Sequence, residues 1–213
     1  NAKAYCMLKE YKISVNRYEA LKAMGDRSFT TLYYLGVSQY ADNWPYGARD
    51  NLLEAHKKNP MDVNVLYYLA KACARSSWKE EGIAYMNKAF DMVVPTDSMM
   101  IRLYDGLLEC YKFHTKADPY EKIEVMKEAY SYTKKYTLFY QIAEIYDYQK
   151  DYVNAVHYYE KYMALVPKNK QAALDSEGNP LPNVDTMYQK ARRRVEKIKV
   201  EDFFRNGAHD DYF

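Results

Sequence analysis

The sequence predicts an all-α fold made of repeated pairs of helices. The phrase LYYLG at 32–36 returns as LYYLA at 66–70 and, more loosely, as FYQIA at 139–143. Apolar residues recur at intervals of three and four over most of the chain, which is the spacing of one helix face. Glycine and proline number only 7 each in 213 residues, which disfavours an all-β fold with many tight turns.

Composition and charge agree with a folded protein. Hydrophobic residues make up 48% and charged residues 28%, so neither a disordered nor a fibrous chain is expected. The 31 basic and 29 acidic residues give a formal net charge of +2, and this balance predicts no general attraction to nucleic acid or an acidic membrane surface. No apolar run approaches the roughly 18 residues of a membrane span. Tyrosine is frequent, with 25 residues against 7 phenylalanines, and its polar-tipped ring suits half-buried positions.

The segment 63–97 shows one repeat unit most fully. Asp62 precedes an apolar pattern with helical spacing. The stretch SWKE at 77–80 has the form of a capping box that opens a second helix, and Pro95 marks the end of that helix. One unit is therefore predicted to be a helix, a short turn, a second helix and a stop.

The same plan recurs in order along the chain. The segments 29–62 and 136–167 both close near a proline, and Asp151 is expected to cap the second helix of the latter. The segment 98–135 is looser, with extra residues in the loop between its two helices. The aligned apolar residues of the four first helices, spaced 34, 38 and 35 positions apart, are Leu35, Leu69, Leu107 and Ile142.

Small residues recur where the two helices of a pair must approach each other closely. A bulky side chain at such a position would push the helices apart. The segment 98–135 has Leu108 at this position instead. The small residues are Gly36, Ala70 and Ala143 on the first helices and Ala48, Gly82 and Ala155 on the second.

A period near 34 residues, paired helices, the Leu-Gly or Leu-Ala marks and the closing prolines resemble the tetratricopeptide repeat (TPR). The resemblance covers 29–167 as four repeats, although none of them begins with the usual tryptophan. Residues 1–28 resemble a partial or degenerate N-terminal repeat. The resemblance implies a right-handed superhelical solenoid whose first helices line a concave groove that holds an extended peptide or a partner helix.

The end of the chain departs from the repeat. Residues 168–183 are expected to form a loop insertion, and residues 207–213 a flexible tail. Between them, Asp185 is expected to cap a final helix within 184–206 that covers the last core face, as the end of a solenoid requires. The predicted apolar face of this helix consists of Met187, Ala191, Val195 and Ile198.

The sequence contains no recognisable motif of an enzyme, a metal site or a cofactor site. Glycine-rich phosphate loops and the HExxH, CxxC and GxSxG patterns are missing. The four histidines lie far apart in the repeat plan, and the three cysteines have neither zinc-site nor disulfide-framework spacing. We therefore predict a non-catalytic protein without a cofactor, a metal or a small-molecule substrate.

The first-helix positions predict a peptide-binding groove rich in tyrosine. Side chains at i, i+4 and i+8 form one stripe on a helix; three of the four stripes begin with tyrosine, one is basic and two contain acids. Tyrosine is a common binding anchor. The charges of neighbouring helices could instead neutralise each other, contributing about 0–1 kcal/mol per exposed pair, and the sequence leaves both interpretations open. The predicted groove residues are Tyr33, Tyr40, Tyr67, Lys71, Arg75, Asp105, Glu109, Tyr140, Glu144, Asp147 and Tyr148.

These observations predict a scaffold or adaptor that binds a protein or peptide partner. One alternative is a homo-oligomerising structural module. Another is an adaptor that meets nucleic acid through the final helix, because residues 185–205 contain seven Lys or Arg and four Asp or Glu; the interleaved acids favour a solubilising cap instead. The compartment stays open: a soluble protein is expected, cytoplasmic, or periplasmic if a signal segment before Asn1 has been removed.

Overall fold

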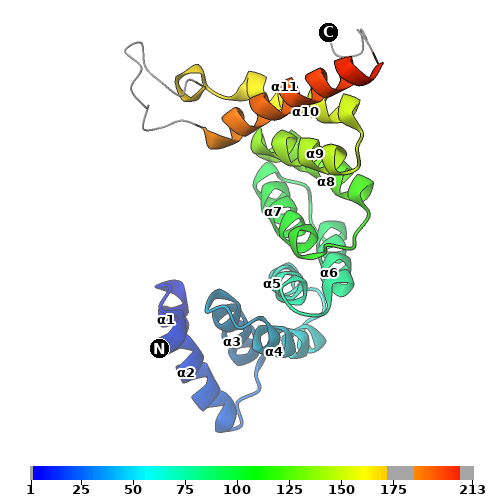
Figure 1. The fold of residues 1–213 in the computed structure, drawn as a ribbon. Helices are drawn as coiled ribbons and strands as arrows, with labels where there is room; N and C mark the ends of the chain where they lie inside the picture. Colours follow the sequence, from blue (N-terminus) through cyan, green and yellow to red (C-terminus); the bar gives the residue numbers. More distant parts are fainter. Residues whose placement is uncertain (1, 172–184, 207–213) are drawn as a thin grey trace. The chain divides into compact units, whose positions relative to one another are not determined.

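The computed structural model describes residues 2–171 and 185–206, the last two of these by their backbone only. Every regular element in these ranges is a helix, so the predicted all-α fold is confirmed (Figure 1). Most of the predicted loop insertion at 168–183 and the whole predicted tail at 207–213 lie outside the described residues.

The chain divides into two compact units between Asp118 and Pro119. This boundary falls inside the segment 98–135, whose repeat pattern is the loosest. The helices of unit 1 are α1 (Ala2–Met7), α2 (Tyr11–Ala23), α3 (Phe29–Ala41), α4 (Pro45–Lys58), α5 (Val63–Ala74), α6 (Lys79–Asp91) and α7 (Asp97–Phe113). Those of unit 2 are α8 (Pro119–Thr133), α9 (Thr137–Tyr148), α10 (Tyr152–Leu165), the short 3-10 helix η1 (Lys168–Lys170) and α11 (Thr186–Asn206).

Successive helices of unit 1 pack side by side. Helix α3 lies against α4, α5 lies against α6, and α5 also contacts both α3 and α7. The aligned apolar residues Leu35, Leu69 and Leu107 are all buried, as the repeat predicts. Burying each such side chain stabilises the fold by roughly 1.5–3 kcal/mol, which explains why the pattern recurs at these positions.

Glycines allow the paired helices of unit 1 to approach each other. A Cβ atom on Gly36 would lie 3.1 Å from the carbonyl oxygen of Ala48 on α4. A Cβ atom on Gly82 would lie 2.8 Å from the carbonyl oxygen of Ala70 on α5. The predicted role of small residues between paired helices is confirmed at both positions.

Helix α7 makes its close approach at a different residue from the one that the repeat alignment indicates. Leu108 stands at the aligned position and is half-buried. The closely packed residue is Gly106, where a Cβ atom would lie 2.5 Å from Met86 Cε and 2.7 Å from Tyr67 Cε2. The glycine of α7 therefore serves packing against the preceding helices α5 and α6.

Aspartates cap several helix starts. The Asp62 carboxylate accepts hydrogen bonds from two first-turn N–H groups of α5 at 2.9 and 3.0 Å, and Asp151 accepts one from α10 at 3.2 Å, as predicted. The predicted capping box at 77–80 is wrong, because α6 begins after Trp78 without a side-chain capping bond. The Ser77 hydroxyl instead lies 3.3 Å from the hydroxyl of Tyr46.

In unit 2, α9 and α10 pack as a pair and α11 covers α10. Asp185 caps α11 as predicted, accepting hydrogen bonds from the N–H groups of Met187 at 2.9 Å and Tyr188 at 3.1 Å. Met187 was predicted on the apolar face but is 38% exposed; Tyr188, three residues before Ala191, lies on that face instead. The buried residues of this face are Ala191, Val195 and Ile198.

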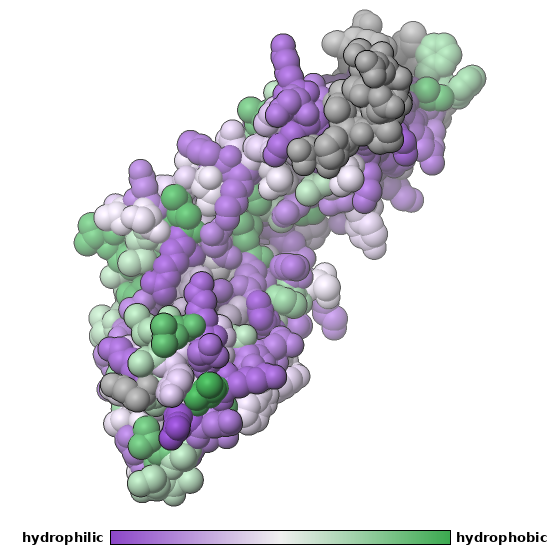
Figure 2. Space-filling model, turned by 90° about the vertical axis from the view of Figure 1, so that its left-hand side faces the viewer, coloured by the Kyte–Doolittle hydropathy of each residue, from purple (hydrophilic) through white to green (hydrophobic). Residues whose placement is uncertain are grey.

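On the face shown in Figure 2, hydrophilic residues predominate and hydrophobic residues form small separate groups. None of the described helices is both long and apolar enough to cross a membrane.

Candidate functional site

Five of the predicted groove residues meet in unit 1 around the carboxylate of Glu109 on α7. Tyr40 of α3 donates its hydroxyl hydrogen to this carboxylate. Nε of Arg75, the residue directly after α5, donates to the same oxygen at 2.6 Å, and Nζ of Lys71 on α5 lies 3.0 Å from the other oxygen. Lys71 also donates to the Tyr67 hydroxyl at 3.4 Å. We call Tyr40, Tyr67, Lys71, Arg75 and Glu109 the Glu109 cluster.

Local helix geometry explains this arrangement. Tyr67 and Lys71 lie on α5, and Arg75 is the C-cap residue directly after it, with helical backbone angles. Because the three follow one another at intervals of four, their side chains share one helix face. Because α5 lies between α3 and α7 in the packing of unit 1, that face can reach Tyr40 on one neighbour and Glu109 on the other.

Tyrosine rings surround the two cations of the cluster. The Lys71 ammonium lies 5.1 Å from the ring centre of Tyr40 and 4.9 Å from that of Tyr67. The Arg75 guanidinium lies 4.5 Å from the Tyr40 ring. Such cation–π contacts stabilise a charge that is partly removed from water.

The cluster is largely buried. The side chains of Lys71, Glu109 and Arg75 are 16%, 17% and 32% exposed. Burial alone would raise the pKa of Glu109, but hydrogen bonds from Tyr40 and Lys71 and the nearby positive charges outweigh it and lower the pKa below its ordinary value. Burial, reinforced by the hydrogen bond to Glu109, raises the pKa of Tyr40. At neutral pH the cluster thus contains an ionised carboxylate and a neutral phenol.

The structure shows that the cluster charges do pair with one another. The pairing is unequal, because two cations share one carboxylate and the cluster keeps a formal charge of +1. Two other predicted residues belong to unit 1. The ring centre of Tyr33 lies 6.3 Å from that of Tyr68. Asp105 is half-buried and lies one turn before Glu109 on α7.

The four predicted residues of unit 2 have different surroundings although all lie on α9. Tyr140 is buried, Glu144 is exposed and Tyr148 is 86% exposed. Asp147 accepts two hydrogen bonds from Arg194 of α11, at 2.6 and 2.7 Å. Asp147 therefore helps to hold the final helix, a role that the repeat pattern did not indicate.

Other basic residues of α11 are also paired with acids. Lys199 lies 2.9 Å from Glu160 of α10. Within α11, Arg192 pairs with Glu196 at 3.0 Å, and Lys197 lies 3.6 Å from Glu201. These contacts favour the cap interpretation of α11 over a surface for nucleic acid.

No group of three or more His, Cys, Asp or Glu residues in the part of the chain that the structure describes could hold a metal ion. Cys6, Cys73 and Cys110 are free and buried. Burial raises the pKa of the Cys73 thiol to about 11 and that of Cys110 to about 12, so both are protonated near neutral pH. That the chain has no catalytic activity stays a prediction.

No protein-family model matches the sequence, and no curated protein matches it either. Several solved structures match the fold. The crystal structure of MamA has a TM-score of 0.62 at 16% identity, over 76% of this chain and 92% of that one. YrrB, described as a TPR protein with an unusual peptide-binding site, has a TM-score of 0.61 at 13% identity, over 78% and 84%.

A third match is the C-terminal part of a TPR repeat-containing protein from Cytophaga hutchinsonii. Its TM-score is 0.63 at 16% identity, over 94% of this chain and 78% of that one. Identities this low establish a shared fold. The chain therefore has the fold of the tetratricopeptide-repeat proteins, as its 34-residue period predicts.

Proposed function

We propose that this chain is a non-catalytic scaffold or adaptor that binds a peptide or protein segment on the face formed by α3, α5 and α7. The observation that carries the proposal is the Glu109 cluster, in which two largely buried cations share a single carboxylate among tyrosine rings. The likeness of the fold to YrrB, whose description includes a peptide-binding site, supports the proposal.

The charge imbalance favours a partner segment that carries Asp or Glu. A carboxylate from the partner would balance the remaining positive charge of Lys71 and Arg75. Arg75 is the more exposed of the two cations, so we expect it to make the first contact. Hydrogen bonds between charged groups are roughly twice as strong as those between neutral groups. Because Tyr40 and Tyr67 already hold both cations in place, binding orders few additional side chains.

The test begins with selection from a library of random 12-residue peptides on the full chain. The affinities of the selected peptides are then measured by fluorescence anisotropy for wild type, Arg75→Gln and Lys71→Met. We expect acidic peptides to be enriched and each substitution to weaken binding at least about tenfold, since one charge-assisted hydrogen bond contributes about 1.5–3 kcal/mol.

Arg17→Gln is the matched control, because Arg17 is an exposed arginine of α2 outside the cluster. Circular dichroism verifies that each variant is folded. Selected peptides without acidic residues, or equal affinities for Arg75→Gln and Arg17→Gln, would show that the Glu109 cluster is not the binding site.

A further inference from the structure

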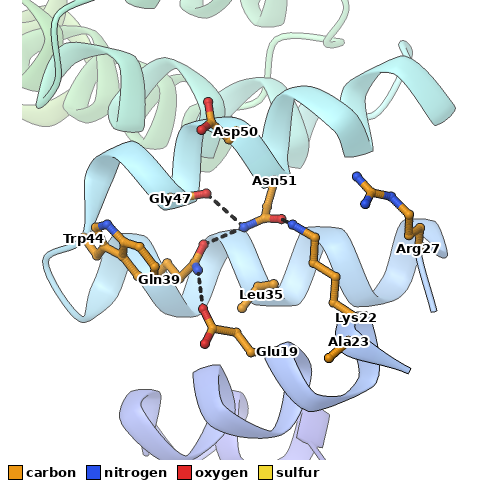
Figure 3. A pocket seen from close by; sticks show the side chains of 10 residues that line it. All are labelled: Glu19, Lys22, Ala23, Arg27, Leu35, Gln39, Trp44, Gly47, Asp50 and Asn51. Carbon is orange, nitrogen blue, oxygen red and sulfur yellow. Dashed lines mark hydrogen bonds between the residues drawn. The ribbon is translucent and has the colours of Figure 1, made fainter. Parts of the chain in front are cut away.

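A separate pocket opens in unit 1 between α2, α3 and α4, and no residue of the Glu109 cluster lines it (Figure 3). Its volume is about 480 Å³, within the range of roughly 300–1,000 Å³ that is usual for small-ligand sites. The lining groups that matter for its chemistry are the acids Glu19 and Asp50, the cations Lys22 and Arg27, the amide of Asn51 and the indole of Trp44.

The floor of the pocket is a continuous hydrogen-bonded network. Lys22 Nζ donates to Asn51 Oδ1 at 2.7 Å, and Asn51 Nδ2 donates to Gln39 Oε1 at 2.8 Å. Gln39 Nε2 in turn donates to Glu19 Oε1 at 3.2 Å. Gln39 is 2% and Asn51 is 4% exposed. Buried amides with satisfied hydrogen bonds form a rigid network, so the charged ends of Lys22 and Glu19 are held in place.

Two cations lie at one end of this pocket. Figure 3 shows Lys22 and Arg27 on the side away from Trp44. Arg27 pairs with Glu54 outside the pocket. The hydrogen-bond partner of Lys22 is the uncharged Asn51, and Glu54 is also close enough to interact with the charge of Lys22. An ammonium group has three donors and a guanidinium five. Both side chains therefore have donors left for an anionic group in the pocket.

An aromatic surface lies at the other end. The Trp44 side chain is 49% exposed, although its position is closely defined. A Cβ atom on Gly47 would lie 3.0–3.2 Å from three atoms of the indole ring, so only a glycine lets the ring rest this close to α4. The backbone N–H of Trp44 donates to the backbone carbonyl oxygen of Gln39 at 2.8 Å, which holds the main chain at this residue. A fixed and exposed tryptophan is a frequent anchor of binding interfaces.

We propose that this pocket is a second binding site, for a short peptide segment with a carboxylate near an apolar side chain. The carboxylate would contact Lys22 and Arg27, and the apolar side chain would lie against the exposed ring of Trp44. A peptide C-terminus and an Asp or Glu side chain offer the same chemistry here. The site is independent of the function proposed above, because the two share no residue.

Three acetylated peptides test the proposal: Ac-Phe-Ala-Ala with a free C-terminus, the same peptide as its amide, and Ac-Phe-Ala-Asp-amide. Binding is followed on the full chain by the indole N–H signals in NMR spectra, since the chain has only 2 tryptophans. We expect a carboxylate peptide to shift the Trp44 signal and leave that of Trp78 unchanged, with binding at least tenfold tighter than that of the neutral amide. The relative affinities of the two carboxylate peptides show whether the site prefers a peptide C-terminus or an Asp side chain.

Variants locate the contact. Arg27→Gln and Lys22→Gln should each weaken binding of the carboxylate peptides about tenfold, whereas Arg17→Gln should leave it unchanged. The dispersion of the NMR spectrum verifies that each variant is folded. The proposal is overturned if no peptide shifts the Trp44 signal, if the neutral amide binds as tightly as the carboxylates, or if Arg27→Gln behaves like Arg17→Gln.

Discussion

Glu109→Gln removes the carboxylate that Tyr40, Lys71 and Arg75 share, while keeping nearly the same size and one oxygen acceptor. Breaking a fully buried ion pair by removing one partner costs about 3–5 kcal/mol, and an exposed pair contributes about 0.2–1 kcal/mol. The three charged side chains are 16–32% exposed, between these limits. We therefore expect Glu109→Gln to lower the free energy of unfolding by about 2 kcal/mol.

The effect should depend on pH in a defined direction. The pKa of Glu109 in the folded protein is lower than the ordinary 4.5, so folding favours its ionised form. Its contribution to stability is complete above the unfolded-state pKa and is lost as the pH falls through the folded-state pKa. Wild type and Glu109→Gln should therefore differ most near neutral pH and converge in acid.

Urea unfolding followed by tryptophan fluorescence measures this difference. Both tryptophans, Trp44 and Trp78, belong to unit 1, so the signal reports on the unit that contains Glu109. Glu54→Gln is the matched control, because its partner Arg27 is 57% exposed and a loss below about 1 kcal/mol is expected. If Glu109→Gln costs no more than Glu54→Gln, burial does not strengthen the cluster and the reasoning is refuted.

Three further predictions concern packing, the final helix and acid stability. Gly82→Ala should destabilise unit 1 by about 1–3 kcal/mol in urea unfolding, because its Cβ would meet the Ala70 carbonyl oxygen at 2.8 Å. Asp147→Asn should weaken the contact with Arg194 by about 1 kcal/mol, seen as roughly fivefold faster hydrogen exchange of α11 amides. Burial lowers the pKa of His56 below 6.5, so the free energy of unfolding should fall as the pH drops through the unfolded-state pKa. His56→Gln should remove this part of the fall when the free energy of unfolding is measured between about pH 7.5 and pH 5.

The repeat could be predicted from the sequence because every unit buries the same helix face. The aligned residues recur 34, 38 and 35 positions apart and are all buried; they are Leu35, Leu69, Leu107 and Ile142. The Glu109 cluster could be predicted only as a set of side chains on facing helices. Whether Lys71 and Arg75 pair with Glu109 depends on the distance between α5 and α7, which no local pattern determines.

Contacts between helices that are distant in the sequence could not be predicted from its hydrophobic periodicity. Arg194 and Asp147 are 47 positions apart and meet only because α11 folds back over the last pair. The sequence also gave little indication of the hydrogen-bonded network that lines the pocket beside Trp44. Gln39 lies between the buried residues Ser38 and Tyr40 of α3, and Asn51 precedes the buried Leu52 of α4. An amide side chain among buried residues of a helix could have indicated a structured polar site.

At both proposed sites of unit 1, the cations have donors available for one more carboxylate, but the two sites differ in exposure. Arg75 is 32% exposed, against 57% for Arg27 in the pocket. Salt screens exposed charges over about 8 Å at 0.15 M ionic strength and screens buried ones much less. Binding in the pocket should therefore weaken with added salt more steeply than binding at the Glu109 cluster. Affinity titrations of both kinds of peptide across a salt series check this, and equal slopes would mean that the two sites are equally open to water.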